Sequence, residues 1–119
     1  LIAKQIIMTL SRIIDALECE VLVQGPDVDV SEGYASDLLS DVMANCPEGA
    51  VWLTLQRHLN VIAVAQLKRI AAILITNGGR PDDAVLEKAG EESVSVLVTP
   101  LDTFSAAGRI HRMLHSEPC

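Results

Sequence analysis

Residues 71–100 read AAILITNGGRPDDAVLEKAGEESVSVLVTP, and this stretch decides the fold. It holds two short apolar runs, 71–76 and 94–98, with a segment of helical character from Pro81 to Gly90 between them. A near-continuous apolar run is typical of a strand buried on both faces, as in a parallel sheet. Proline and acidic residues at the start of a segment and glycine at its end are typical of a helix. The stretch therefore predicts a strand, a helix and a second strand.

The same alternation extends on both sides of this unit. The apolar run 51–55 and the helical segment 60–69 precede it, and a helix from Asp102–Thr103 to Leu114 follows it. The first half is less regular. We expect an opening strand within 1–8, a helix capped by Thr9 or Ser11 and running through Leu17, and a strand at 20–23. A strand-like segment then covers 28–34, with a bulge or turn at Gly33, and a helix at 38–44 is capped by Ser36–Asp37. The alternation predicts one α/β domain, residues 1–119, with a mainly parallel sheet and helices on both faces.

Composition and charge narrow the function classes. The chain has 119 residues, half of them hydrophobic, which is enough to build a core without disulfides or metals. Its 9 basic and 16 acidic residues leave a net charge of -7, which disfavours nucleic acids and anionic membranes as partners. The opening apolar run is too short for a signal peptide or a membrane span. Three cysteines (Cys19, Cys46 and Cys119) without metal-ligand spacing favour a reducing, cytoplasmic compartment.

Three polar turns follow the strands of the predicted sheet. The carboxyl ends of parallel strands meet at one edge, where α/β folds hold their ligands. Glycines before a helix can present backbone N–H groups to an anion, and arginine and histidine suit the same ligand. The candidate ligand-binding residues are Gln56, Arg57, His58, Asn77, Gly78, Gly79, Thr99, Asp102 and Thr103.

The turns also have structural interpretations, which stay open at this point. Residues 77–79 suit a tight turn that needs positive φ, and 99–103 suit a helix cap. The glycine turn lacks the pattern of a Walker A loop or of a dinucleotide fingerprint. His111 and His115 share a helix face without a third ligand, so we expect an exposed helix end and no metal site. No nucleophile–base arrangement is recognisable, and we predict neither catalytic residues nor a cofactor.

Several separated segments resemble stand-alone members of the DRTGG domain family. They are residues 33–45, 52–56 with His58, 73–82 and 96–104, in that order. The naming pentapeptide is replaced by Val30-Ser31-Glu32-Gly33-Tyr34. Domains of this family lie ahead of the catalytic part of some phosphotransacetylases and between CBS domains of some pyrophosphatases, and the N-terminal domain of HPr kinase has a similar fold. The resemblance implies an accessory or regulatory module. Short relatives resemble proteins encoded near iron hydrogenase or serine-kinase components.

Three hypotheses about function follow. The first is a non-catalytic module that senses a small anionic metabolite or nucleotide and forms a homodimer, since the chain is rich in aliphatic residues and the family's relatives assemble. The second is a protein-interaction subunit of a redox (hydrogenase-type) or kinase-linked regulatory system without a small-molecule ligand. The third is a small phosphate-transferring enzyme, which the absence of a recognisable nucleophile, base or metal set disfavours.

Overall fold

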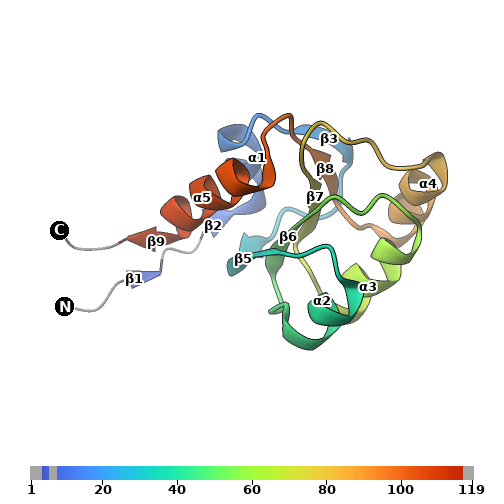
Figure 1. Ribbon diagram of the computed structural model, residues 1–119, viewed down its shortest axis with the longest axis horizontal. Helices are drawn as coiled ribbons and strands as arrows, with labels where there is room; N and C mark the ends of the chain where they lie inside the picture. Colours follow the sequence, from blue (N-terminus) through green and yellow to red (C-terminus); the bar gives the residue numbers. More distant parts are fainter. Residues whose placement is uncertain (1–3, 6–7, 117–119) are drawn as a thin grey trace.

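A five-stranded sheet forms the centre of the molecule (Figure 1). The computed structural model of the chain describes residues 4–5 and 8–116. In spatial order the strands are β3 (Glu20–Val23), β8 (Val96–Val98), β7 (Ala72–Ile75), β6 (Ala50–Thr54) and β5 (Glu32–Ala35). Neighbours from β5 to β8 are parallel, and β3 pairs antiparallel with β8. The predicted, mainly parallel sheet is confirmed.

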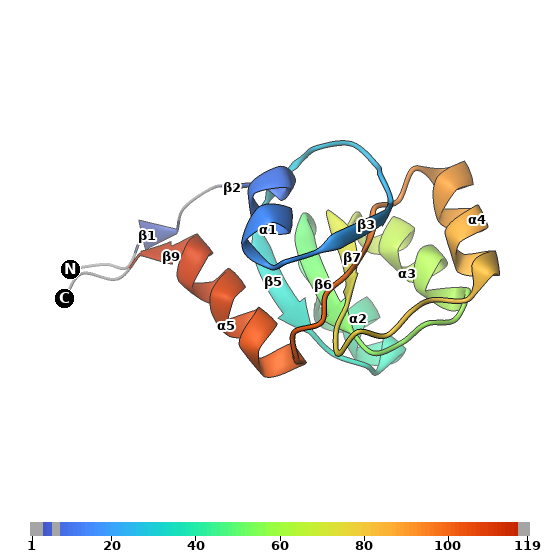
Figure 2. The same ribbon diagram turned by 90° about the horizontal axis from the view of Figure 1, so that it is seen from above.

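Helices cover both faces of this sheet (Figure 2). One face carries α2 (Leu39–Asn45), α3 (Asn60–Lys68) and α4 (Asp83–Glu92), and the other carries α1 (Leu10–Ala16) and α5 (Thr103–Leu114). Successive strand residues point to opposite faces, so Trp52 joins the first core and Leu53 the second. Every residue of β6, β7 and β8 is buried, which explains why their sequences show no polar alternation.

Some predicted boundaries are wrong for identifiable reasons. α4 begins at Asp83, two residues after Pro81, and continues past Gly90 to Glu92. A Cβ at Gly90 would meet no atom within 4 Å, and the helix ends where Ser93 takes a φ of 57°. Gly33 forms no bulge: it pairs regularly with Val51.

The predicted strand over 28–34 is in fact two strands in different sheets. Asp29–Val30 forms β4, which pairs antiparallel with β2 (Met8–Thr9), and β5 begins only at Glu32. The expectation of an opening strand in residues 1–8 lies partly outside the described residues. Within them, β1 (Lys4–Gln5) pairs antiparallel with β9 (His115–Ser116) and projects from the main body (Figure 1).

The two described cysteines are free thiols of low reactivity. Burial raises the pKa of the Cys19 thiol and of the Cys46 thiol to about 11 each. The thiolate is the reactive form, so both groups are poor nucleophiles near neutral pH. Within the described part of the chain, no helix has the length and apolar character needed to cross a membrane.

Candidate ligand site at the carboxyl ends of the strands

Backbone hydrogen bonds join the turns that follow β7 and β8. The N–H of Asn77 donates to the carbonyl of Leu101 at 2.8 Å, and the N–H of Gly78 donates to the carbonyl of Thr99 at 2.8 Å. Asn77 and Gly78 have φ values of 59° and 67°, as the tight-turn interpretation requires. These two amides donate within the protein, so binding of an anion here depends on side chains.

The turn after β6 lies against the turn after β7. Arg57 Nη1 approaches the carbonyl of Arg80 at 3.5 Å, and the N–H of Asp82 donates to the carbonyl of Arg57 at 3.3 Å. A Cβ at Gly79 would lie 3.4 Å from Cδ of Arg57. The structure therefore brings all three polar turns to one edge of the sheet.

Two of the predicted hydroxyls hold the fold together at this edge. The Thr99 side chain is buried, and its hydroxyl donates to the carbonyl of Leu17 at 2.7 Å and accepts from the N–H of Leu101 at 3.2 Å. The hydroxyls of Thr76 and Thr103 share a hydrogen bond of 2.6 Å. The Thr99 hydroxyl is therefore directed to the end of α1.

Asp102 is the N-cap of α5. Its Oδ1 accepts from the N–H of Ser105 at 2.8 Å, and its Oδ2 accepts from the Ser105 hydroxyl at 2.9 Å. The backbone bond from Ser105, followed by the bond from its side chain, lowers the pKa of the Asp102 carboxyl. The capping interpretation of this residue is confirmed.

We expect Asp102 to make the stability of the fold sensitive to acid. Because its pKa is lower in the folded chain, the carboxylate contributes stability above its unfolded pKa of about 4 and loses it as the pH falls through the folded value. Asparagine caps helices as well as aspartate but does not titrate. Urea unfolding near pH 7 and at about pH 3 should therefore show a smaller acid-induced loss for Asp102→Asn than for the unmodified chain. Equal losses would contradict this role.

Gln56 and the preceding strand end are organised by Asp37, which sequence reasoning misplaced. We predicted Ser36–Asp37 as a helix cap, but the N-cap of α2 is Leu38, without a side-chain cap bond. Asp37 Oδ1 instead accepts from the Thr54 hydroxyl at 2.9 Å and from the N–H of Leu55 at 2.6 Å. Gln56 Nε2 donates to the carbonyl of Asp37 at 2.8 Å. Asp37 comes shortly after β5, just as the polar turns come after the other strands. This position in the sequence could have indicated that Asp37 lies at the same edge of the sheet.

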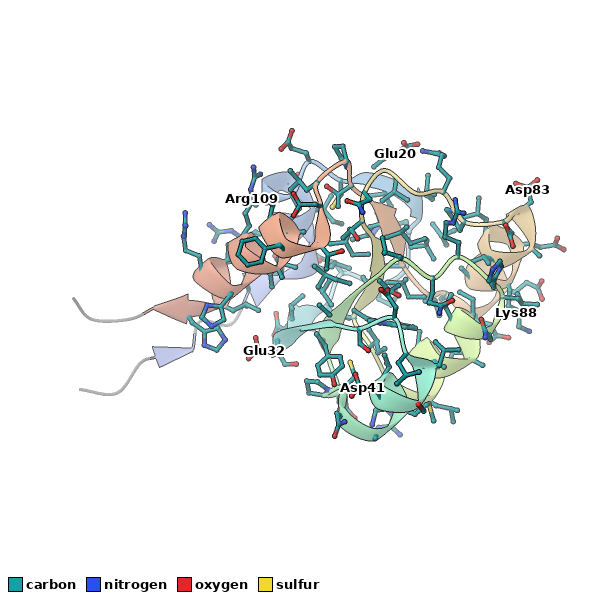
Figure 3. The ribbon with its side chains drawn as sticks, viewed as in Figure 1. Glu20, Glu32, Asp41, Asp83, Lys88 and Arg109 are labelled. Atoms are coloured by element: carbon teal, nitrogen blue, oxygen red, sulfur yellow. The ribbon has the colours of Figure 1, made fainter. Side chains whose placement is uncertain are left out.

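Among the described residues at this edge, Arg80 and His58 each lie beside a carboxylate, whereas Arg57 does not. Arg80 forms a two-point hydrogen-bonded ion pair with Glu20 on β3, which lowers the pKa of Glu20 (Figure 3). His58 Nδ1 lies 3.1 Å from Asp82 Oδ2, and both side chains are exposed. Among the described residues, Arg57 has no carboxylate within ion-pair distance. Its guanidinium is therefore the free cation of the edge.

The surroundings of Arg57 are partly apolar. Leu55 and Leu59, on either side of it in sequence, are about half exposed, at 46% and 49%. A hollow of about 270 Å³ lies at the same edge beside Arg80, but Glu18 and Glu20 line it and would repel an anion. An anionic ligand is therefore better placed over Arg57 than in this hollow.

The two histidines at the end of α5 were predicted to be exposed, and this is correct for only one of them. The rings of His111 and His115 stack with centroids 4.4 Å apart. His111 is exposed as predicted, but His115 is only 23% exposed and its Nε2 lies 3.0 Å from both carboxylate oxygens of Glu32 on β5. The contact between His115 and Glu32 joins the end of α5 to the edge strand β5. Among the described residues, no group of three or more His, Cys, Asp or Glu side chains is placed to hold a metal.

A second hollow, which sequence reasoning missed, lies between α5 and the edge strand β5. Its volume is about 360 Å³, and Gly33, Tyr34, Phe104, Ala107 and Gly108 are among its lining residues. A Cβ at Gly33 would lie 3.0 Å from Ile110 Cγ2, so glycine permits the close approach of α5 there. The small residues of α5 then leave the hollow open.

Comparison with known proteins identifies the fold. The family model described as the DRTGG domain matches residues 12–113. A solved structure of the CBS and DRTGG domains from the regulatory region of a Clostridium perfringens pyrophosphatase, complexed with the activator diadenosine tetraphosphate, superposes with a TM-score of 0.68 at 19% identity. The match covers 89% of this chain and 47% of that one, so this chain spans about half of its length. A search of curated proteins found no match.

Proposed function

The chain belongs to the DRTGG domain family, and from this we propose that it is a non-catalytic regulatory module that binds a small anionic metabolite or nucleotide. The similar pyrophosphatase domains support this proposal, because they form a regulatory region and were solved with a nucleotide activator. We further propose that the module acts as a homodimer and that it works in the cytoplasm.

One observation carries the ligand proposal: the unpaired guanidinium of Arg57 at the point where the turns meet. A guanidinium has a planar set of N–H donors that matches a phosphate or carboxylate. The net charge of -7 disfavours anions over much of the surface, so an unpaired arginine is the strongest local attraction for one. Leu55 and Leu59 offer apolar contact to the rest of the ligand, such as a base.

Replacing Arg57 should abolish the response to the ligand. A panel of nucleotides and acyl phosphates is screened by thermal shift, since a ligand at a hundred times its Kd adds about 2.7 kcal/mol to the free energy of unfolding. We expect at least one compound to raise the Tm, and Arg57→Ala to remove the shift. Arg12→Ala is the matched control, because it also removes an exposed arginine but from another place in the fold. Arg12 lies in α1, whose first residues contact Asp27 and Val28. An undiminished shift in Arg57→Ala would refute the site.

The alternative is a protein-interaction subunit in a redox or kinase-linked system. Large exposed apolar side chains favour it: Leu38, Leu67 and Phe104 are 64%, 69% and 89% exposed. Affinity capture from native cells with the tagged chain discriminates the two. A stoichiometric protein partner together with no thermal shift across the panel would favour the alternative.

A further inference from the structure

We infer that helix α5 is the surface through which the chain self-associates, by packing antiparallel against α5 of a second copy. The inference rests on the self-association proposed above and gives it a location. The contact surface is the α5 seam, which we define as Phe104, Gly108 and His111. These residues are spaced so that they lie along one face of the helix.

The α5 seam combines a protruding side chain with empty space. Phe104, the one phenylalanine of the chain, is 89% exposed. Four residues further along the helix, a Cβ at Gly108 would meet no atom within 4 Å. Hollows of about 360 Å³ and about 380 Å³ both border Gly108, and the second is lined also by His111, Arg112 and His115. An exposed aromatic next to unfilled space is typical of the centre of an interface.

The spacing of the α5 seam suits a second copy of the same helix. Phe104 and His111 lie four residues before and three residues after Gly108, so the glycine separates two rings on one face of the helix. In an antiparallel pair whose two-fold axis passes next to Gly108, Phe104 therefore lies opposite His111 of the partner subunit, and the glycines of the two copies lie close to the axis. Each ring meets a ring or a space, and both halves of the contact are identical, as a two-fold interface requires.

Charge also favours the antiparallel arrangement. α5 begins next to the carboxylate of Asp102 and carries Arg112 in its last turn, and among the described residues Arg112 has no carboxylate partner. An antiparallel copy brings the acidic start of each helix toward the basic end of the other. The dipoles of the two helices are then also opposed, which is favourable. A partner of other sequence would need the same order of charge and bulk, which a second copy already has.

Sedimentation velocity across micromolar to submillimolar concentrations tests the inference. The unmodified chain should sediment as a dimer, and Gly108→Lys should sediment as a monomer because its side chain fills the space needed by the partner. Lysine is a better helix former than glycine and its Cβ would meet no atom within 4 Å at this position, so the variant should remain folded. Phe104→Ala should weaken the dimer. Leu67→Ala, which removes an apolar side chain 69% exposed on α3, should leave it intact.

The possible outcomes separate this inference from the ligand proposal. A monomeric unmodified chain, or a dimer that survives both Gly108→Lys and Phe104→Ala, overturns the α5 surface. Arg57→Ala should remain dimeric while it loses the thermal shift. Failure of the thermal shift alone would count against the ligand site and leave the dimer contact standing. A dimer broken by Leu67→Ala and not by Gly108→Lys would move the interface to α3.

Discussion

Trp52→Ala is expected to lower the free energy of unfolding by about 3–5 kcal/mol, the range for truncating a large aromatic side chain in a core. Trp52 is fully buried in β6, between residues of the core under α2 and α3. Its indole N–H donates to the carbonyl of Ser36 at 2.8 Å. The substitution removes this bond as well as the packing, because alanine leaves both a cavity and a carbonyl without its donor.

Urea unfolding followed by circular dichroism measures this loss. Trp52 is the one tryptophan of the chain, so the tryptophan fluorescence signal would disappear with the substitution. Leu67→Ala serves as the exposed control and should change the free energy of unfolding by no more than about 0.5 kcal/mol. A loss below about 1 kcal/mol for Trp52→Ala would contradict the central position of β6.

Thr99→Val is expected to cost about 1–3 kcal/mol although the two side chains have nearly the same shape. The buried hydroxyl of Thr99 donates to the carbonyl of Leu17 and accepts from the N–H of Leu101. Valine leaves both partners without their bond at a position where the side chain is 1% exposed. The end of α1 and the turn after β8 should both loosen as a result.

Thr99→Ser is the matched control for this prediction, because serine keeps the hydroxyl and loses only a methyl group. Chemical denaturation of the three proteins should rank Thr99→Val as less stable than Thr99→Ser. The reverse ranking would mean that the methyl group, and with it apolar packing, determines the contribution of this residue.

The sequence predicted the second half of the fold well because its signals are local. An apolar run, a glycine turn and a helix start lie next to one another in 71–100, and the two strands of this stretch pair with each other. The first half depends on pairings between distant segments. β3 and β5 lie at opposite edges of the sheet although eight residues separate them, and no local pattern encodes that passage. The pairing of β2 with β4 divides 28–34 for the same reason.

The candidate site was predictable in position and not in orientation. Parallel strands bring the ends of β6, β7 and β8 to one edge, so the meeting of the three turns followed from the fold class. The direction of each side chain depends on partners far away in sequence. The hydroxyl of Thr99 is turned inward by a carbonyl 82 positions earlier, and Arg80 is taken up by Glu20. Arg57 differs from Arg80 because, among the described residues, it has no carboxylate within ion-pair distance, and only the structure shows this.

The pairing of β1 with β9 forms a short two-stranded ribbon that projects from the domain. Because the first and last described strands lie side by side, the chain enters and leaves the folded body at one place. A domain connected in this way can be inserted into a longer polypeptide as a cassette, without separating the segments on either side of it.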